Sequence, residues 1–90
     1  MDKTEFAGKL KAEGYAEIET KGLEANCTNT EHAHEFDVRA MVLDGEITLT
    51  SGGESRTYRS GDVFNMAAGC AHAERVGAQG VRYVVGRRRR

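Results

Sequence analysis

The stretch that decides the fold reads VRAMVLDGEITLT, residues 38–50. Residues 38–43 form a nearly all-apolar strand, as expected for burial on both faces or at a subunit interface. Residues 46–50 form a second β-rich run. The Asp44-Gly45 pair between the two runs predicts a hairpin, because both positions of a type I′ turn need positive φ angles.

Working outward, glycines divide the second half of the chain into pieces of about eight residues, the spacing of short strands in a sandwich or barrel. Gly52-Gly53 and Ser60-Gly61-Asp62 are predicted turns, and residues 81–85 are the last predicted strand. Upstream, residues 15–20 alternate with a period of two, and a second run covers residues 23–27. We therefore predict seven or eight short strands in an antiparallel β-barrel or jelly roll.

The first residues follow a helical pattern instead. Asp2-x-x-Glu5 can form a capping box, Phe6 and Leu10 lie one turn apart, and Gly14 is a suitable C-terminal stop. We predict an amphipathic helix over residues 3–13. The predicted fold class is all-β with one short N-terminal helix. The single domain divides into a helical segment (1–14), a barrel (15–86) and a basic tail (87–90).

Length and composition fit one small globular domain. The chain has 90 residues, of which 39% are apolar and 30% charged, a balance that excludes a disordered chain. The longest apolar run, residues 40–43, is far below the ~20 residues of a membrane helix. The first five residues lack the apolar stretch of a signal peptide. We expect a cytoplasmic protein without a membrane partner.

Charge is distributed unevenly along the chain. The net charge of −1 argues against a nucleic-acid partner. Four of the thirteen basic residues are Arg87–Arg90, so in residues 1–86 only nine basic residues face fourteen acidic ones. We expect this run of like charges to be solvated and mobile. Cys27 and Cys70 lack a C-x-x-C spacing and are expected to be reduced thiols.

The only three histidines are His32, His34 and His72. On a strand, residues i and i+2 point to the same face with Cα atoms roughly 6.5–7 Å apart, so His32 and His34 can converge on one ion. An opposing strand could bring His72 across the barrel to them. Three imidazoles make a transition-metal site. The alternative is two exposed polar residues and an unrelated loop histidine.

The surroundings of the histidines resemble the two sequence motifs of the cupin superfamily. His32-Ala33-His34 and Gly45 match the first motif, and Gly61, Gly69 and His72 fall at the spacing of the second. The resemblance covers residues 26–76 and is greatest to small, single-domain, RmlC-like cupins. It implies a barrel that holds a divalent transition metal (Zn, Ni, Fe, Mn or Cu) through His32, His34 and His72.

Four positions depart from the motifs: Asn26 replaces a glycine, Val38 an acidic ligand, Ala67 a proline and Val76 an asparagine. The change at Val38 removes a metal ligand. Asp37 takes its place if the strand bulges after His34, because a bulge re-aims a side chain by one position. In a regular strand Asp37 points outward beside Arg39 in an exposed ion pair, and the site has three histidines.

Two further residues have alternative interpretations. Arg39 interrupts an apolar strand, so it is a structural ion-pair partner or an inward cation that holds an anionic ligand. Cys70 lies two residues before His72 and is a buried inert thiol or a group that faces the metal. Glu35, beside the histidines, is expected to be solvated.

The resemblance implies two classes of function. One is a metal-dependent enzyme of dioxygenase, isomerase or lyase type that acts on a polar small molecule. The other is a non-catalytic cupin that binds a metal or small ligand for sensing or sequestration, and the fold alone leaves both open. A homodimer is expected, with residues 38–43 and 81–85 as candidate contact surfaces, because covering a sheet edge stabilises a small barrel.

Overall fold

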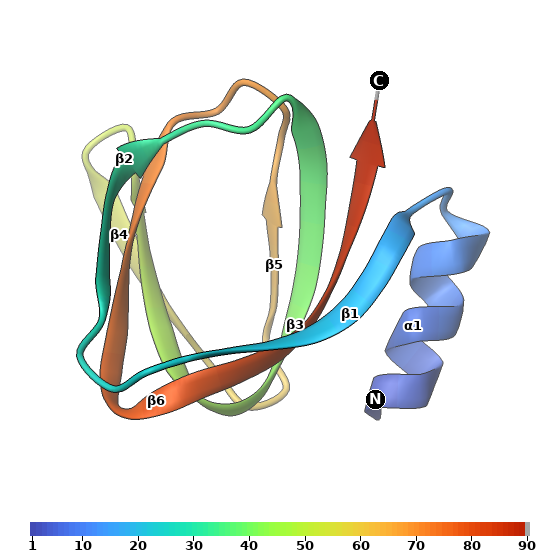
Figure 1. Cartoon of the computed structure of the whole chain (residues 1–90), viewed down its shortest axis with the longest axis horizontal. Coiled ribbons are helices and arrows are strands. Elements are labelled where there is room, and N and C mark those ends of the chain that lie inside the picture. The colour runs from blue at the N-terminus through green and yellow to red at the C-terminus, as the bar shows by residue number, and fades with distance from the viewer. Residues whose placement is uncertain (90) are drawn as a thin grey trace.

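The computed structural model describes residues 1–89, which form one helix followed by six strands (Figure 1). The elements are α1 (Lys3–Ala12), β1 (Ala16–Leu23), β2 (Thr28–His32), β3 (Phe36–Ser51), β4 (Glu54–Arg59), β5 (Val63–Met66) and β6 (His72–Arg89). All strand pairs are antiparallel. The predicted all-β class with one short N-terminal helix is therefore confirmed.

The two long strands, β3 and β6, each take part in two layers. Residues 36–42 of β3 pair with residues 83–89 of β6, and β5 and β1 lie on their outer sides. Residues 47–50 of β3 pair with residues 73–76 of β6, and here β4 and β2 are the outer strands. Six strands thereby supply two four-stranded layers, which is the architecture of a jelly roll.

The hairpin predicted at Asp44-Gly45 is wrong, because β3 continues through both residues. Gly45 has a φ of 77° and lies where the pairing of β3 with β6 shifts its register. A Cβ atom at Gly45 would lie 1.9 Å from the carbonyl oxygen of Gly80, which has a φ of 75° itself. The glycine serves a bend between the two layers, where the backbones of β3 and β6 touch.

The predicted turn at Gly52-Gly53 is correct, since it joins β3 to β4. The helix also agrees with its prediction: it ends one residue earlier than expected, and the Asp2 carboxylate accepts a hydrogen bond from the Glu5 amide at 2.8 Å. Phe6 and Leu10 pack on the outside of the barrel with Tyr15, Met41 and Val84. Among the described residues, no helix is both long and apolar enough to cross a membrane.

The barrel interior is filled by side chains from both layers. Its buried residues are Val38, Ala40, Val42, Ile47, Leu49, Phe64, Val76, Val81, Tyr83 and Val85. Residues 38–43 are therefore buried on both faces, by this interior and by α1. They and residues 81–85 lie in strands with a neighbour on each side, so neither segment offers a free sheet edge in this chain. The homodimer itself stays a prediction.

The expected mobile tail is wrong for residues 87–89, because β6 continues through Arg89, whereas the side chains of Arg88 and Arg89 are exposed to solvent as expected. Acidic residues of neighbouring strands neutralise these arginines: Arg87 and Arg89 pair with Glu17, and Arg88 pairs with Asp37. The guanidinium groups of Arg87 and Arg89 also lie 5.6 and 5.2 Å from the centre of the Phe36 ring. Arg90 lies outside the described residues.

Because Gly45 and Gly80 are in contact, we expect any side chain at Gly45 to destabilise the fold strongly. Gly45→Ala should lower the free energy of unfolding by about 3 kcal/mol or more, because left-handed strain adds to a backbone clash. Gly52→Ala is the matched control, since Gly52 has a φ of 59° but no atom within 4 Å of its Cβ position. It should cost about 1–2 kcal/mol. Equal losses in urea unfolding would contradict the close contact.

Candidate metal centre

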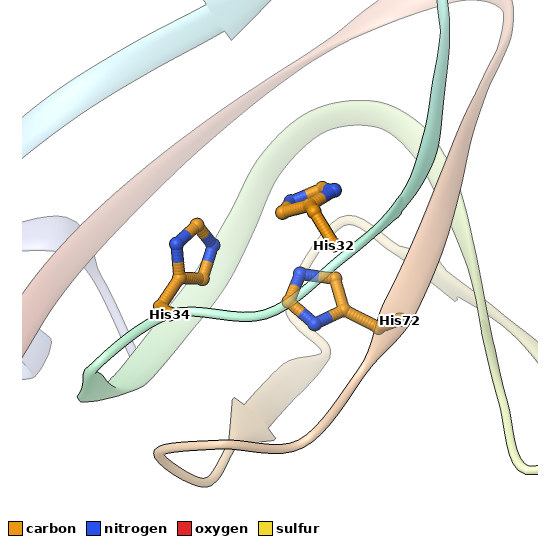
Figure 2. A group of neighbouring side chains, drawn as sticks. All are labelled: His32, His34 and His72. Atoms are coloured by element: carbon orange, nitrogen blue, oxygen red, sulfur yellow. The ribbon is translucent and has the colours of Figure 1, made fainter.

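Three histidines meet at one end of the barrel, where β2 ends and β6 begins (Figure 2). His32 is the last residue of β2 and lies directly opposite His72, the first residue of β6. His34 follows in the segment that leads to β3. One ring nitrogen from each histidine can be chosen so that all three lie within 4.8 Å of one another. The structure therefore brings together the three histidines that the sequence singled out.

Backbone carbonyl groups form hydrogen bonds with the Nδ1 atoms of two of these histidines and so orient their rings. The Nδ1 atom of His32 lies 2.7 Å from the Thr30 carbonyl oxygen, and Nδ1 of His72 lies 3.1 Å from that of Cys70. Because a carbonyl oxygen only accepts, each Nδ1 carries the proton and donates it. Each Nε2 atom then keeps its lone pair free to bind a cation, an arrangement typical of histidines that bind metal.

The Nε2 atom of His72 provides a direct test of whether the site suits a metal. It is buried, and it has no hydrogen-bond partner within residues 1–89. An unsatisfied buried polar atom raises the free energy of the folded state, so native proteins seldom leave one without a ligand. A divalent transition metal satisfies such a lone pair, and imidazole nitrogens are ligands that it prefers. The residues present fit the metal that the histidine motif implies.

The environment of the third imidazole, His34, favours its neutral form. Burial, and then the charges of His72 and His32, lower the pKa of His34. Neutral imidazole is the form that binds metal. The ring stacks on Phe36 with the ring centres 4.9 Å apart, and the His34 carbonyl accepts a hydrogen bond from the Gly69 amide at 2.8 Å. These contacts hold His34 in place although it lies outside a strand.

A cavity of about 160 Å³ opens beside the histidines. Its walls are mainly apolar, and they include Val38 at the position where the cupin motif has an acidic ligand. The polar residues that line it, besides His32 and His34, are Lys21, Asn29, Glu74, Tyr83 and Arg87. Burial, and then the negative charge of Glu74, raise the pKa of the Tyr83 phenol, so it stays protonated at neutral pH.

Asp37 does not join the histidines. Residues 36–42 pair with β6 without a register shift, so no bulge after His34 turns Asp37 inward. It is 5% exposed on the outer face of β3, where it accepts a hydrogen bond from the Ala68 amide at 2.9 Å and pairs with Arg88 at 3.2 Å. The expected exposed ion pair with Arg39 is wrong, because Asp37 is buried and Arg39 pairs with Glu13.

From the outer face of β3, Asp37 instead binds the turn that carries part of the site. The Ala68 amide that it binds belongs to the turn before His72, and the adjacent Gly69 amide binds the His34 carbonyl. Asp37 therefore helps to position two of the histidines from the outer face of β3. Cys70, in the same turn, is exposed with its Sγ atom 3.4 Å from the Ser51 hydroxyl, so the buried thiol expected from sequence is wrong. Glu35 is exposed, as expected.

Several polar residues of the cavity are not singled out by the motifs. Glu74 lies two residues after His72 on the same strand, so the period of two places both side chains on one face. That spacing is the signal that could have identified Glu74 from the sequence. Lys21 and Asn29 carry no comparable signal, because their inward position depends on how β1 and β2 pair with β6.

Comparison with known proteins gives the family. The family model described as the EutQ-like cupin domain matches residues 13–84. No curated protein is significantly similar to this chain. A Rhizobium leguminosarum bv. viciae protein of unknown function has a similar solved structure, with a TM-score of 0.76 and 18% identity, over 81% of this chain and 69% of that chain.

Two further solved structures are similar in fold. KdgF from Halomonas sp. has a TM-score of 0.64 and 20% identity, over 81% of this chain and 80% of that chain. The DMSP lyase DddQ from Ruegeria pomeroyi has a TM-score of 0.71 and 22% identity, over 79% of this chain and 36% of that chain. Because the family match spans most of the sequence, the chain belongs to the EutQ-like cupin domain family.

Proposed function

We propose that this cupin is a metal-dependent enzyme of dioxygenase, isomerase or lyase type that acts on a small polar molecule with an anionic group. The observation that carries the proposal is the buried, unpartnered Nε2 atom of His72, which lies in a group with His32 and His34. The adjoining cavity gives a small molecule access to that group. A structural role alone would not require His32 and His34 to line a cavity beside His72.

His32, His34 and His72 would hold the divalent transition metal. When bound, such a metal supplies Lewis-acid polarisation of a carbonyl or enolate oxygen. The carbonyl groups of Thr30 and Cys70 orient two of the imidazole rings through their Nδ1 protons. Because these partners are backbone atoms, the ring orientation is set by the fold before any ligand arrives.

The cavity sets the size and charge of the substrate. At about 160 Å³ it is smaller than the ~300–1,000 Å³ of pockets for drug-sized ligands, so it suits a molecule with few heavy atoms. Lys21 and Arg87 lend its wall positive charge, and the Tyr83 phenol can donate a hydrogen bond. These residues take the role considered for Arg39, which lies outside the cavity lining.

The alternative is a cupin that binds a metal or small ligand without turnover. Structures of similar fold include a DMSP lyase and proteins of unknown function, so the fold is compatible with either. A screen of small carboxylic acids with metal-loaded protein separates the two. Turnover that is lost in His34→Ala supports the enzyme, whereas saturable binding without turnover supports the alternative.

The metal itself is the first prediction. Protein purified without added metal should contain close to one divalent transition metal ion per chain, measured by elemental analysis. His34→Ala should lose most of it, because two imidazoles bind an ion far less tightly than three. Glu35→Ala, which alters an exposed neighbour, is the control and should retain the ion. Full metal content in a His32→Ala/His72→Ala double variant would contradict the site.

Asp37 gives the second prediction. Asp37→Asn should lower the free energy of unfolding by about 1–3 kcal/mol, because a buried hydrogen-bonded carboxylate loses its charge beside Arg88. The metal-to-protein ratio of the folded variant should equal that of wild type. Thermal unfolding and elemental analysis of one preparation measure both quantities. Loss of metal with unchanged stability would instead make Asp37 a ligand.

A further inference from the structure

We propose that Glu74 supplies the carboxylate ligand of this metal centre, in place of the acidic residue that the cupin motif has at the position of Val38. The proposal rests on the proposed metal centre and extends it, because it assigns the fourth protein ligand to β6 instead of β3. Two of the four ligands, His72 and Glu74, would then come from one face of one strand.

Distance supports this assignment. The Oε1 atom of Glu74 lies 3.8 Å from the Nε2 atom of His32, the nitrogen whose lone pair is free. Metal–nitrogen and metal–oxygen bonds of about 2.0–2.2 Å allow two ligand atoms of one ion to be up to about 4.2 Å apart. Glu74 stands outside the group of three whose ligand atoms lie within 4.8 Å of one another, so its side chain must turn toward His34 and His72.

Burial supports it as well. The Glu74 side chain is 13% exposed, yet among the ion pairs of residues 1–89 its partner is His32 and not a lysine or arginine. A carboxylate in such a place raises the free energy of the folded state unless positive charge lies nearby. A divalent cation between Glu74 and the histidines would lie closer to the carboxylate than the ~4 Å limit of an ion pair, which neither Lys21 nor Arg87 of the same cavity lining meets. The side-chain amide of Asn29 donates a hydrogen bond to Oε1 at 3.3 Å.

The positions of the other nearby carboxylates exclude them as ligands of the same ion. Asp37 lies on the outer face of β3 and Glu35 is exposed, whereas Glu74 is the one acidic residue in the lining of the cavity formed by the described chain. Glu74 is therefore the carboxylate best placed to reach an ion held by the three imidazoles.

The test uses the full chain, stripped of metal and titrated with Co²⁺ against a chelator. Glu74→Gln keeps the shape of the side chain and an oxygen for the Asn29 hydrogen bond, and removes the anionic oxygen. It should weaken Co²⁺ binding tenfold or more and change the visible absorption spectrum of the bound Co²⁺. Glu35→Gln, which removes an exposed carboxylate next to His34, should change neither. Melting temperatures of the metal-free variants check that each is folded.

Three results would overturn the proposal. An affinity of Glu74→Gln within twofold of wild type means that Glu74 does not bind the ion. Weaker binding with an unchanged Co²⁺ spectrum means that the carboxylate acts only through its charge. Absence of Co²⁺ binding by wild type removes the metal centre itself, and this outcome is separate from the first two because the wild-type titration alone reveals it. Should Glu74→Gln fail to fold, Glu74→Asp, with a shortened carboxylate, should show the same two changes.

Discussion

The contact of the β3 and β6 backbones at Gly45 and Gly80 is the constraint on which the rest of the structure depends. Only residues without a Cβ atom allow this approach, since a methyl group at Gly45 would overlap the Gly80 carbonyl. The bend lets each long strand pass from one layer to the other. The second half of β3 can then pair with the first half of β6, which begins at His72 and lies opposite His32. The bend at Gly45 therefore determines that His72 lies beside His32.

The sequence predicts the site better than it predicts the strands. His32 and His34 are two residues apart, and that separation has the same meaning in any extended segment. The positive φ angle at Gly45 was also anticipated, but a glycine after aspartate is equally suited to a hairpin and to a bend within a strand. Choosing between them needs the position of Gly80, which is 35 residues away in the sequence. Local patterns cannot supply that information.

The arginines and Asp37 illustrate a second limit. A run of four like charges is normally mobile, yet here Arg87–Arg89 form a strand because Glu17 and Asp37 of neighbouring strands neutralise them. Those partners are up to 72 residues apart in the chain, so no local window contains the pair. Glu74 could not be identified for the same reason. Its spacing from His72 is visible in the sequence, but its proximity to His32 depends on the register of β2 with β6.

The central place of β6 has a kinetic consequence. This strand is the last in the described chain, yet it lies between β3 and both β1 and β2, so every one of those strands needs it as a partner. Until residues 72–89 have left the ribosome, β1 and β2 have no strand to pair with, and the long edge of β3 stays open. Folding of the barrel is therefore dominated by contacts distant in sequence, which favours slow folding. In that interval the apolar segment of residues 38–43 is exposed to chaperones and to aggregation.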